Sequence, residues 1–316
     1  MHRAHPLRGY LYIAAAAFLW GIAATLGRAA FTGRLLPRGQ SFHEIDPLIL
    51  SQCRVTFSLV VLAVALIAGR GPRRLKLPWP DFARLCLLGI FGVAASNYLY
   101  YLAIQRTNVA TAIILQYTAP VWVLLYAVIR GNQKATLQKL SAVLLAMTGI
   151  ALVIGLFSGG FRLDKKGVIA ALLAAFSFAF YNVGGHDLLE RYDRWIVLLY
   201  ALLSASLLWV VVDPPWKIIS AHYAASQWLF LFVFSMISVL AAFSFYFAGL
   251  QHLEPTRAVV VSCLEPVFSI VIAAIALGEV LRPQQMLGIM VVLAGIMVVQ
   301  WPERNSQSSV TIEPVD

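Results

Sequence analysis

Long apolar runs separated by short polar segments fill most of the chain. Each run holds roughly 20 residues, the length that an α-helix needs to cross the hydrocarbon core of a bilayer. The runs lie at 9–31, 47–69, 82–104, 108–130, 138–157, 167–188, 195–213, 227–250, 256–278 and 284–301. This pattern predicts an all-α polytopic membrane protein with ten transmembrane helices.

The segments between the runs carry residues that end helices. The stretch GRGPRRLKLPWPD at 69–81 contains glycine, prolines and a basic cluster, and DPPWK at 213–217 cannot continue a helix. The polar segment 303–316 predicts a disordered cytoplasmic tail. The basic and then alanine-rich N-terminus is similar to a signal peptide, but its apolar part continues to about Phe31. We interpret it as an uncleaved first helix, with a signal peptide as the alternative.

Composition supports the membrane assignment and narrows the function. The chain is 60% hydrophobic and 12% charged, whereas a soluble domain carries about 25% charged residues. The net charge of +10 does not predict a nucleic-acid partner, because basic residues in membrane proteins gather in cytoplasmic loops. The sequence has no GxxxxGK[ST] loop, no HExxH, no GxSxG and no Cys/His pair at metal-ligand spacing. We therefore expect no enzyme activity, no metal and no cofactor.

The distribution of lysine and arginine predicts the orientation in the membrane. With a cytoplasmic N-terminus, the inner segments hold 14 of these residues and the outer segments 8, the loop at 70–76 contributing most. Because this bias sets orientation, we predict an inner-membrane protein with both termini in the cytoplasm. The segment RLDKK at 162–166 opposes that orientation.

The sequence contains an internal repeat: when the chain is aligned with itself at an offset of 146 residues, similar segments coincide. Pro120 then meets Pro266, and Gly149 meets Gly295, each within a longer aligned stretch. A chance alignment of two apolar segments is the alternative, but prolines and glycines in register over more than 40 residues argue against it.

The repeat predicts two halves, residues 1–157 and 158–302, with five spans each. Because five is an odd number, the second half enters the bilayer in the opposite orientation. Inverted repeats around a central cavity are typical of secondary transporters, whose binding sites lie near the midplane between the halves.

Several segments resemble the drug/metabolite transporter superfamily, in its EamA-type exporter branch. They are FLWG at 18–21, PLILSQCR at 47–54, NYLYYLAIQRTNVATAIILQYTAPV at 97–121, LEPVFSIVIAAIALGE at 264–279 and GIMVVLAGIMVV at 288–299. The resemblance covers about residues 10–300 and implies ten helices in two inverted halves that export amino acids and other small metabolites. Two positions depart from the pattern: Gln133 stands where the second half has an acid, and Phe178 where a tryptophan would match Trp20.

Two charged residues lie deep inside the predicted spans. Arg54 is about 10 Å and Glu265 about 13 Å from the nearer helix end at 1.5 Å per residue, and a charge at such depth is costly. The repeat aligns Glu265 with Ala119, so the charge is not shared by the two halves. We consider three roles for Glu265: pairing with Arg54 across the cavity, binding of a substrate amine or a coupling proton, and a structural hydrogen bond.

The two prolines of the repeat predict paired kinks. Pro120 and Pro266 free backbone carbonyls near Gln116 and Ser262. Freed carbonyls inside a bundle can bind polar groups of a ligand. The prolines could serve as hinges for alternating access or as plain packing kinks.

Aromatic and amide side chains complete the candidate substrate site. A cavity lined by rings, amides and a carboxylate suits an amphiphilic solute such as an amino acid. For Tyr98 and Tyr101 an interfacial aromatic belt is the alternative. The candidate residues are Trp20, Asn97, Tyr98, Tyr101, Gln116, Tyr181, Asn182, Tyr246 and Glu265.

Small residues in the fifth and tenth spans, such as Gly149 and Gly295, predict close helix packing or a homodimer face. Taken with the resemblance, the sequence favours a secondary transporter that exports amino acids, aromatic or large neutral ones above others, by facilitated diffusion. The alternatives are a proton-coupled drug or metabolite exporter, a nucleotide-sugar-type exchanger and, ranking lower, a membrane-embedded enzyme. The expected partners are a small-molecule substrate and the lipid bilayer.

Overall fold

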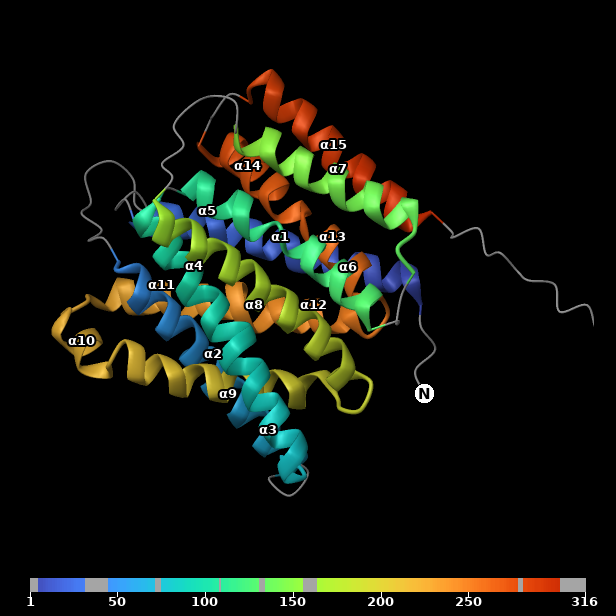
Figure 1. The fold of residues 1–316 in the computed structure, drawn as a ribbon. Helices are drawn as coiled ribbons and strands as arrows, with labels where there is room; N and C mark the ends of the chain where they lie inside the picture. The colour runs from blue at the N-terminus through green and yellow to red at the C-terminus, as the bar shows by residue number, and fades with distance from the viewer. Residues whose placement is uncertain are drawn as a thin grey trace, which may run out of the picture.

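The computed structural model describes a bundle of helices inclined to one another (Figure 1). The described residues are 5–31, 45–71, 75–107, 109–130, 134–155, 164–277 and 281–301. The predicted tail at 303–316 and Gln133 lie outside these ranges.

The helices follow one another along the chain with only short connections. In chain order they are α1 (Pro6–Phe31), α2 (Pro47–Arg70), α3 (Trp79–Leu87), the π-helical turn η2 (Leu88–Ala94), α4 (Ala95–Arg106), α5 (Val109–Gln116), α6 (Ala119–Ile129), α7 (Leu137–Ile154), α8 (Lys165–Leu189), α9 (Arg194–Val212), α10 (Pro215–Ser220), α11 (Ala225–Ser235), the π-helical turn η4 (Met236–Ala241), α12 (Ala242–Leu250), α13 (Pro255–Ser262), α14 (Leu264–Leu277) and α15 (Pro283–Gln300).

Within the described ranges, ten helical segments are long and apolar enough to cross a membrane, which confirms the prediction of a polytopic all-α protein. The short helix α10 was not predicted. It begins at Pro215, because a proline at the first helical position lacks only an N–H that would have no partner there. Both described ends of the chain lie at the same end of the bundle, as an even number of crossings requires (Figure 1).

Aspartates set the starts of several spans. The Asp46 carboxylate accepts hydrogen bonds from the backbone N–H groups of Leu48 and Ile49, at 2.7 and 3.3 Å. Asp164 caps α8 and Asp193 caps α9 in the same way. These caps satisfy N–H groups that the first helical turn leaves without partners.

Two spans in each of the two predicted halves are irregular at matching places. The third span contains η2 and the eighth contains η4. The fourth span breaks between α5 and α6 at Tyr117–Thr118, and the ninth breaks at Cys263 between α13 and α14. Pro120 and Pro266 each lie in the first turn of the helix after the break. A proline is tolerated there because its missing N–H has no helical acceptor to lose.

The helix pairs also match between the halves. Helix α4 packs against α8 as α12 packs against α1, while α2 contacts α9 and α6 contacts α13. Helices α7 and α15 lie side by side along one margin of the bundle (Figure 1).

Glycines allow α7 and α15 to approach closely. A Cβ atom on Gly149 would lie 2.6 Å from the backbone nitrogen of Val292, and one on Gly288 would lie 2.6 Å from that of Val153. The small-residue faces predicted for the fifth and tenth spans therefore contact each other within one chain. They are packing faces of the protomer, and a dimer would need another surface.

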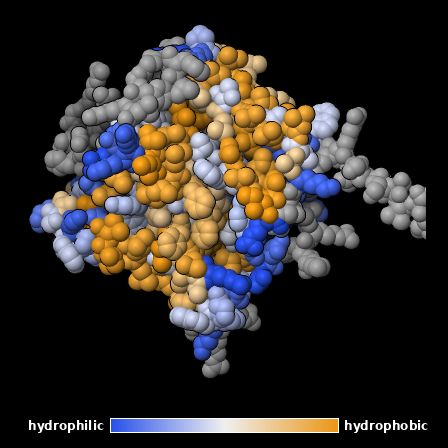
Figure 2. All heavy atoms as spheres, viewed as in Figure 1, coloured by the Kyte–Doolittle hydropathy of each residue, from blue (hydrophilic) through white to orange (hydrophobic). Residues whose placement is uncertain are grey.

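The surface matches a bilayer environment. Figure 2 shows apolar residues over much of the visible face, with hydrophilic residues toward its margins. Large apolar side chains such as Ile129, Val211 and Ile275 are strongly exposed. Such a surface is expected where lipid replaces water as the solvent.

Candidate functional site

The helix breaks of the two halves meet through a hydrogen bond. The Tyr117 hydroxyl donates to the Glu265 carboxylate at 2.9 Å, from the break of the fourth span to that of the ninth. Glu265 is half-buried. A carboxylate at this depth needs such a partner, because an unpaired charge inside a membrane protein is costly.

Arg54 on helix α2 forms a second polar contact between helices. Its guanidinium donates to the side-chain oxygen of Asn97 on α4. Asn97 in turn donates to the Val93 carbonyl at 2.7 Å, within the π-helical turn η2. The hydrogen-bonded partners of Arg54 and Glu265, two residues that the structure describes, are Asn97 and Tyr117. Arg54 and Glu265 therefore form no direct ion pair in this conformation.

Helix α1 packs directly against the helix that carries the carboxylate. A Cβ atom on Gly21 would lie 2.9 Å from the backbone nitrogen of Ser269 and 3.2 Å from the carbonyl oxygen of Glu265. The Thr25 hydroxyl also donates to the carbonyls of Gly21 and Ser269, at 3.0 and 3.3 Å. The FLWG segment therefore holds α1 against the start of α14.

An aromatic cluster forms a wall beside these polar groups. The Trp20 ring contacts Phe243 and Tyr246, with centroids 5.3 and 5.1 Å apart, and its indole N–H donates to the Ser238 carbonyl at 3.1 Å. Tyr246 donates its hydroxyl to Asn182. Tyr181 stacks on Tyr246 with centroids 6.1 Å apart. Tyr181, Asn182 and Tyr246 are fully buried, so ring and amide contacts between helices occupy them in this conformation.

The remaining predicted residues lie apart from the cluster. Tyr98 is exposed and faces Trp209 with centroids 6.4 Å apart. Tyr101 is half-buried beside Tyr100. Gln116 is half-buried and ends α5, one residue before Tyr117. The structure thus brings Trp20, Tyr181, Asn182 and Tyr246 together, and it brings Arg54 to Asn97.

Sequence reasoning missed Tyr117. The repeat and the proline indicated a break near Gln116, and that break is present. The side chain that reaches Glu265 belongs to the next residue, because the chain turns at Tyr117–Thr118 before α6 begins. The QYTAP segment could have indicated it, since a tyrosine just before a proline-containing break carries a hydroxyl to the point where the helix opens.

An ionic cluster joins the halves at the end of the bundle that holds the termini. Lys139, at the start of α7, is 4% exposed and forms an ion pair with Glu254 at 3.2 Å. Arg257 approaches Glu254 at 3.8 Å and donates to the Tyr10 hydroxyl at 3.4 Å. The cluster links helices of both halves.

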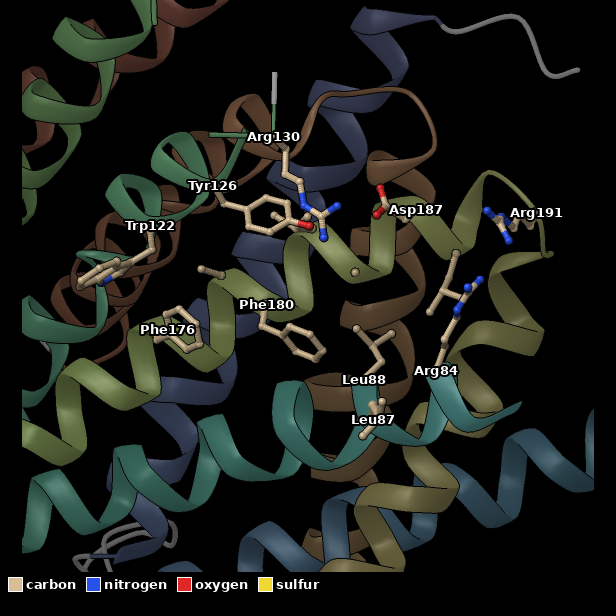
Figure 3. Close-up of a pocket in the computed structure, with 14 residues that line it drawn as sticks. Arg84, Leu87, Leu88, Trp122, Tyr126, Arg130, Phe176, Phe180, Asp187 and Arg191 are labelled. Carbon is tan, nitrogen blue, oxygen red and sulfur yellow. The ribbon is translucent and has the colours of Figure 1, made fainter. Parts of the chain in front are cut away.

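A lateral groove opens at the same end, between α3 with η2, α6 and α8 (Figure 3). Its volume is about 560 Å³. The walls are apolar and aromatic, and charged residues gather at one end of the groove, opposite Trp122 and Phe176 (Figure 3). The residues that define the lateral groove are Arg84, Leu87, Leu88, Trp122, Tyr126, Arg130, Phe176, Ala179, Phe180, Val183, Gly184, Asp187, Leu188 and Arg191.

A tyrosine and an aspartate join two neighbouring segments beside this groove. The Tyr192 hydroxyl donates to Asp81 at 2.5 Å, and Arg84 approaches Asp81 at 3.3 Å. The hydrogen bond to Asp81 raises the pKa of Tyr192 above its usual value. Tyr192 therefore remains a neutral donor that ties the turn after α8 to α3.

Metal ligands do not cluster in the part of the chain that the structure describes, where no group of three or more His, Cys, Asp or Glu side chains could hold an ion. A bundle of ten membrane-length helices whose centre carries a carboxylate, a guanidinium, amides and rings is the architecture of a multi-pass membrane transporter. The chain belongs to the EamA-like transporter family, whose model matches residues 7–155 and again residues 165–301.

Curated relatives are transporters of similar length. YicL of Salmonella typhimurium, described as an uncharacterized inner membrane transporter, is 22% identical over 302 residues, 94% of this chain and 97% of YicL. YwfM of Bacillus subtilis, described as an uncharacterized transporter, is 24% identical over 95% of this chain and 96% of its own. The threonine/homoserine exporter RhtA of Escherichia coli K12 is 26% identical over 80% of this chain and 83% of its own.

A crystal structure of a protein with 21% sequence identity superposes with a TM-score of 0.76, over 94% of this chain and 97% of the other. At this identity the likeness concerns the fold alone.

Proposed function

We propose that the protein is a secondary transporter that exports amino acids or related small metabolites by alternating access. The observation that carries the proposal is the hydrogen bond from Tyr117 to Glu265, which joins the broken spans of the two halves. Broken helices at mid-membrane are where secondary transporters bind polar substrate groups. The Glu265 carboxylate is the group that would bind a substrate amine.

The matching irregularities of the two halves support an inverted repeat. The same family model matches residues 7–155 and 165–301. The π-helical turns and the proline-containing breaks recur at corresponding places. Such a pair of halves supplies two related conformations, one open to each side. In this proposal Pro120 and Pro266 mark the hinges.

The substrate class follows from the chemistry around Glu265. An α-amino acid presents an ammonium group, a carboxylate and a side chain, for which Glu265, Arg54 with Asn97, and the aromatic wall are suitable partners. Trp20 and Phe243 are half-buried rings of that wall, which favours an aromatic or large neutral side chain. The name of the relative RhtA, a threonine/homoserine exporter, supports an amino acid as the cargo.

The test uses purified protein in liposomes. Vesicles loaded with a labelled aromatic or branched amino acid should lose the label faster than protein-free vesicles, and unlabelled substrate should compete. The same assay with drugs and nucleotide sugars separates the alternatives. If no solute of any of these classes moves, the transporter proposal fails.

Proton coupling is the second candidate, and the position of Glu265 inside a predicted span favours it, because a carboxylate at this depth can bind a proton as well as an amine. We favour facilitated diffusion, because few acids lie inside the predicted spans. An imposed pH gradient distinguishes the two mechanisms. Under facilitated diffusion it should leave the accumulated level of a neutral amino acid unchanged, whereas coupling would drive the amino acid against its gradient.

We also propose a location in an inner membrane with both termini on the cytoplasmic side. The relative YicL is described as an inner membrane transporter. The predicted inner segments hold 14 lysines and arginines and the predicted outer segments 8, a bias that supports this orientation.

A further inference from the structure

The lateral groove combines two features that a water-soluble ligand does not need. Several of its wall residues are exposed on the outside of the bundle: Leu87 at 47%, Phe176 at 58% and Phe180 at 39%. In a membrane protein these side chains face acyl chains. The volume of about 560 Å³ lies within the range of roughly 300–1,000 Å³ for small-molecule sites.

Charge is concentrated at one end of the groove. Arg84, Arg130 and Arg191 line it together with a single aspartate, Asp187 (Figure 3). The Arg130 guanidinium lies over the Tyr126 ring at 5.4 Å from the centroid. Arg84 shares the Asp81 carboxylate with Tyr192. The three arginines therefore outnumber the two aspartates, Asp187 and Asp81, so this end of the groove carries a net positive charge.

The groove is as long as one leaflet is thick. Along α8, Phe176 and Asp187 are eleven residues apart, roughly 16 Å at 1.5 Å per residue. Half of a hydrocarbon core of about 30 Å is nearly the same length. Trp79, strongly exposed at the start of α3, marks the level of the headgroups, where tryptophan is enriched. Arg84 follows Trp79 on the same helix, between one and two turns further along.

We propose that the lateral groove binds an anionic phospholipid of the leaflet on this side. Its acyl chain lies along the aromatic walls toward Trp122 and Phe176, and its phosphate is held by Arg84, Arg130 and Arg191. A guanidinium group can donate two parallel hydrogen bonds to two oxygens of one phosphate. This bidentate geometry makes the binding more specific than attraction to a general basic surface. Basic pockets between transmembrane helices on the cytoplasmic side recognise anionic headgroups in this way.

Native mass spectrometry of the delipidated full-length protein tests the proposal. Phosphatidylglycerol and phosphatidylcholine of identical acyl chains are titrated separately, and the affinity of the first adduct is compared. Wild-type protein should prefer phosphatidylglycerol. Arg130→Gln and Arg191→Gln should each lower its affinity about fivefold, the effect of one basic residue at a membrane surface, without changing the affinity for phosphatidylcholine.

Two matched controls separate the groove from general effects. Arg8→Gln removes an exposed arginine of α1 that does not line the groove, and it should leave the preference unchanged. Gly184→Leu fills the groove, since even a Cβ there would lie 3.2 Å from Leu88, whereas a Cβ on Gly69 meets open space. Gly184→Leu should therefore lower the affinity for both lipids, whereas Gly69→Leu should lower the affinity for neither lipid. Size-exclusion chromatography identifies any variant that fails to fold.

Three results would overturn the proposal. The first is equal affinity of wild-type protein for the two lipids. The second is an equal loss of affinity for phosphatidylglycerol in the Arg130→Gln and Arg8→Gln variants. The third is a concentration-dependent dimer that Gly184→Leu abolishes while lipid binding persists, since a second copy of the chain would then occupy the groove. These measurements require no transport activity, so they do not depend on the proposed function.

Discussion

Tyr117 and Glu265 are 148 residues apart in the chain, and their side chains are joined by a 2.9 Å hydrogen bond. Each lies at the interruption of a membrane span, and the two spans occupy matching places in the two halves. Any movement that separates α6 from α14 must lengthen or break this bond. It is therefore a contact whose loss can report a change of conformation.

The charge of Glu265 should be needed for transport. Glu265→Gln keeps the shape and an acceptor oxygen for Tyr117 but removes the negative charge. We expect the export rate to fall about tenfold or more, because hydrogen bonds to charged groups are worth about 1.5–3 kcal/mol, while the protein still folds. Efflux from liposomes over a range of pH measures this. Unchanged flux with an unchanged pH profile would remove Glu265 from the working site.

The hydroxyl of Tyr117 should matter for the same reason. Tyr117→Phe leaves the carboxylate charged but takes away its donor, so we expect a transport loss of about tenfold and lower thermal stability. Tyr126→Phe is the matched control, since Tyr126 is exposed on the following helix. If the two variants transport equally well, the hydrogen bond has no role in the cycle.

Arg54 should couple more strongly to Asn97 than to Glu265. Its guanidinium is hydrogen-bonded to Asn97, whereas the hydrogen-bonded partner of Glu265 is Tyr117. Double-mutant cycles with alanine at Arg54 and at each partner measure the coupling in unfolding free energy. We expect about 1–3 kcal/mol with Asn97 and less than about 1 kcal/mol with Glu265. A larger coupling with Glu265 would mean that a direct ion pair forms in solution.

Adding one methyl group should have opposite effects at two glycines. Gly149→Ala should destabilise the protein by about 1–3 kcal/mol, because the new Cβ would lie 2.6 Å from the Val292 backbone nitrogen. Gly69→Ala should be neutral or stabilising by up to about 1 kcal/mol, since nothing lies within 4 Å of its Cβ position. Thermal unfolding in detergent compares them. Equal shifts in Tm would contradict the close contact of α7 with α15.

Labelling of single introduced cysteines should establish the orientation. Lys134 and Lys217 are exposed near opposite ends of the bundle, before α7 and in α10. With a cytoplasmic N-terminus, a membrane-impermeant maleimide should label Lys217→Cys in intact cells and Lys134→Cys only after lysis. The wild-type protein is the control, because Cys53 and Cys263 are buried and Cys86 lies within α3. The reverse labelling pattern would invert the proposed topology.

The sequence predicted the spans because membrane helices need long apolar runs, and each predicted run corresponds to a helical segment. The breaks were also foreseeable, because Pro120 and Pro266 cannot continue the hydrogen-bond ladder. The π-helical turns were not foreseeable. LGIFGVA in η2 has no residue that demands a wider turn, so the turn depends on packing against neighbouring helices.

The sequence indicated which kinds of side chain form the candidate site, but only in part which of them lie next to one another. Asn97 and Tyr98 were both predicted to line the substrate site, but Asn97 binds Arg54 while Tyr98 is exposed beside Trp209. A residue and its neighbour in a helix point about 100° apart, so one contributes to the centre and the other to the surface. Which of them turns inward depends on how the helix is rotated within the bundle, and periodicity in an apolar span does not specify that rotation.

The glycine contact of α7 with α15 also has a consequence for biogenesis. These are the last spans of their halves, so α7 leaves the ribosome more than a hundred residues before its partner is made. Until then the face of α7 that holds Ala142, Ala146 and Gly149 has no partner from α15. A chain that ends before α15 would leave that face unpaired, and incompletely packed chains of this kind are prone to misassembly. The packing of α7 is therefore completed only when the last described span is made.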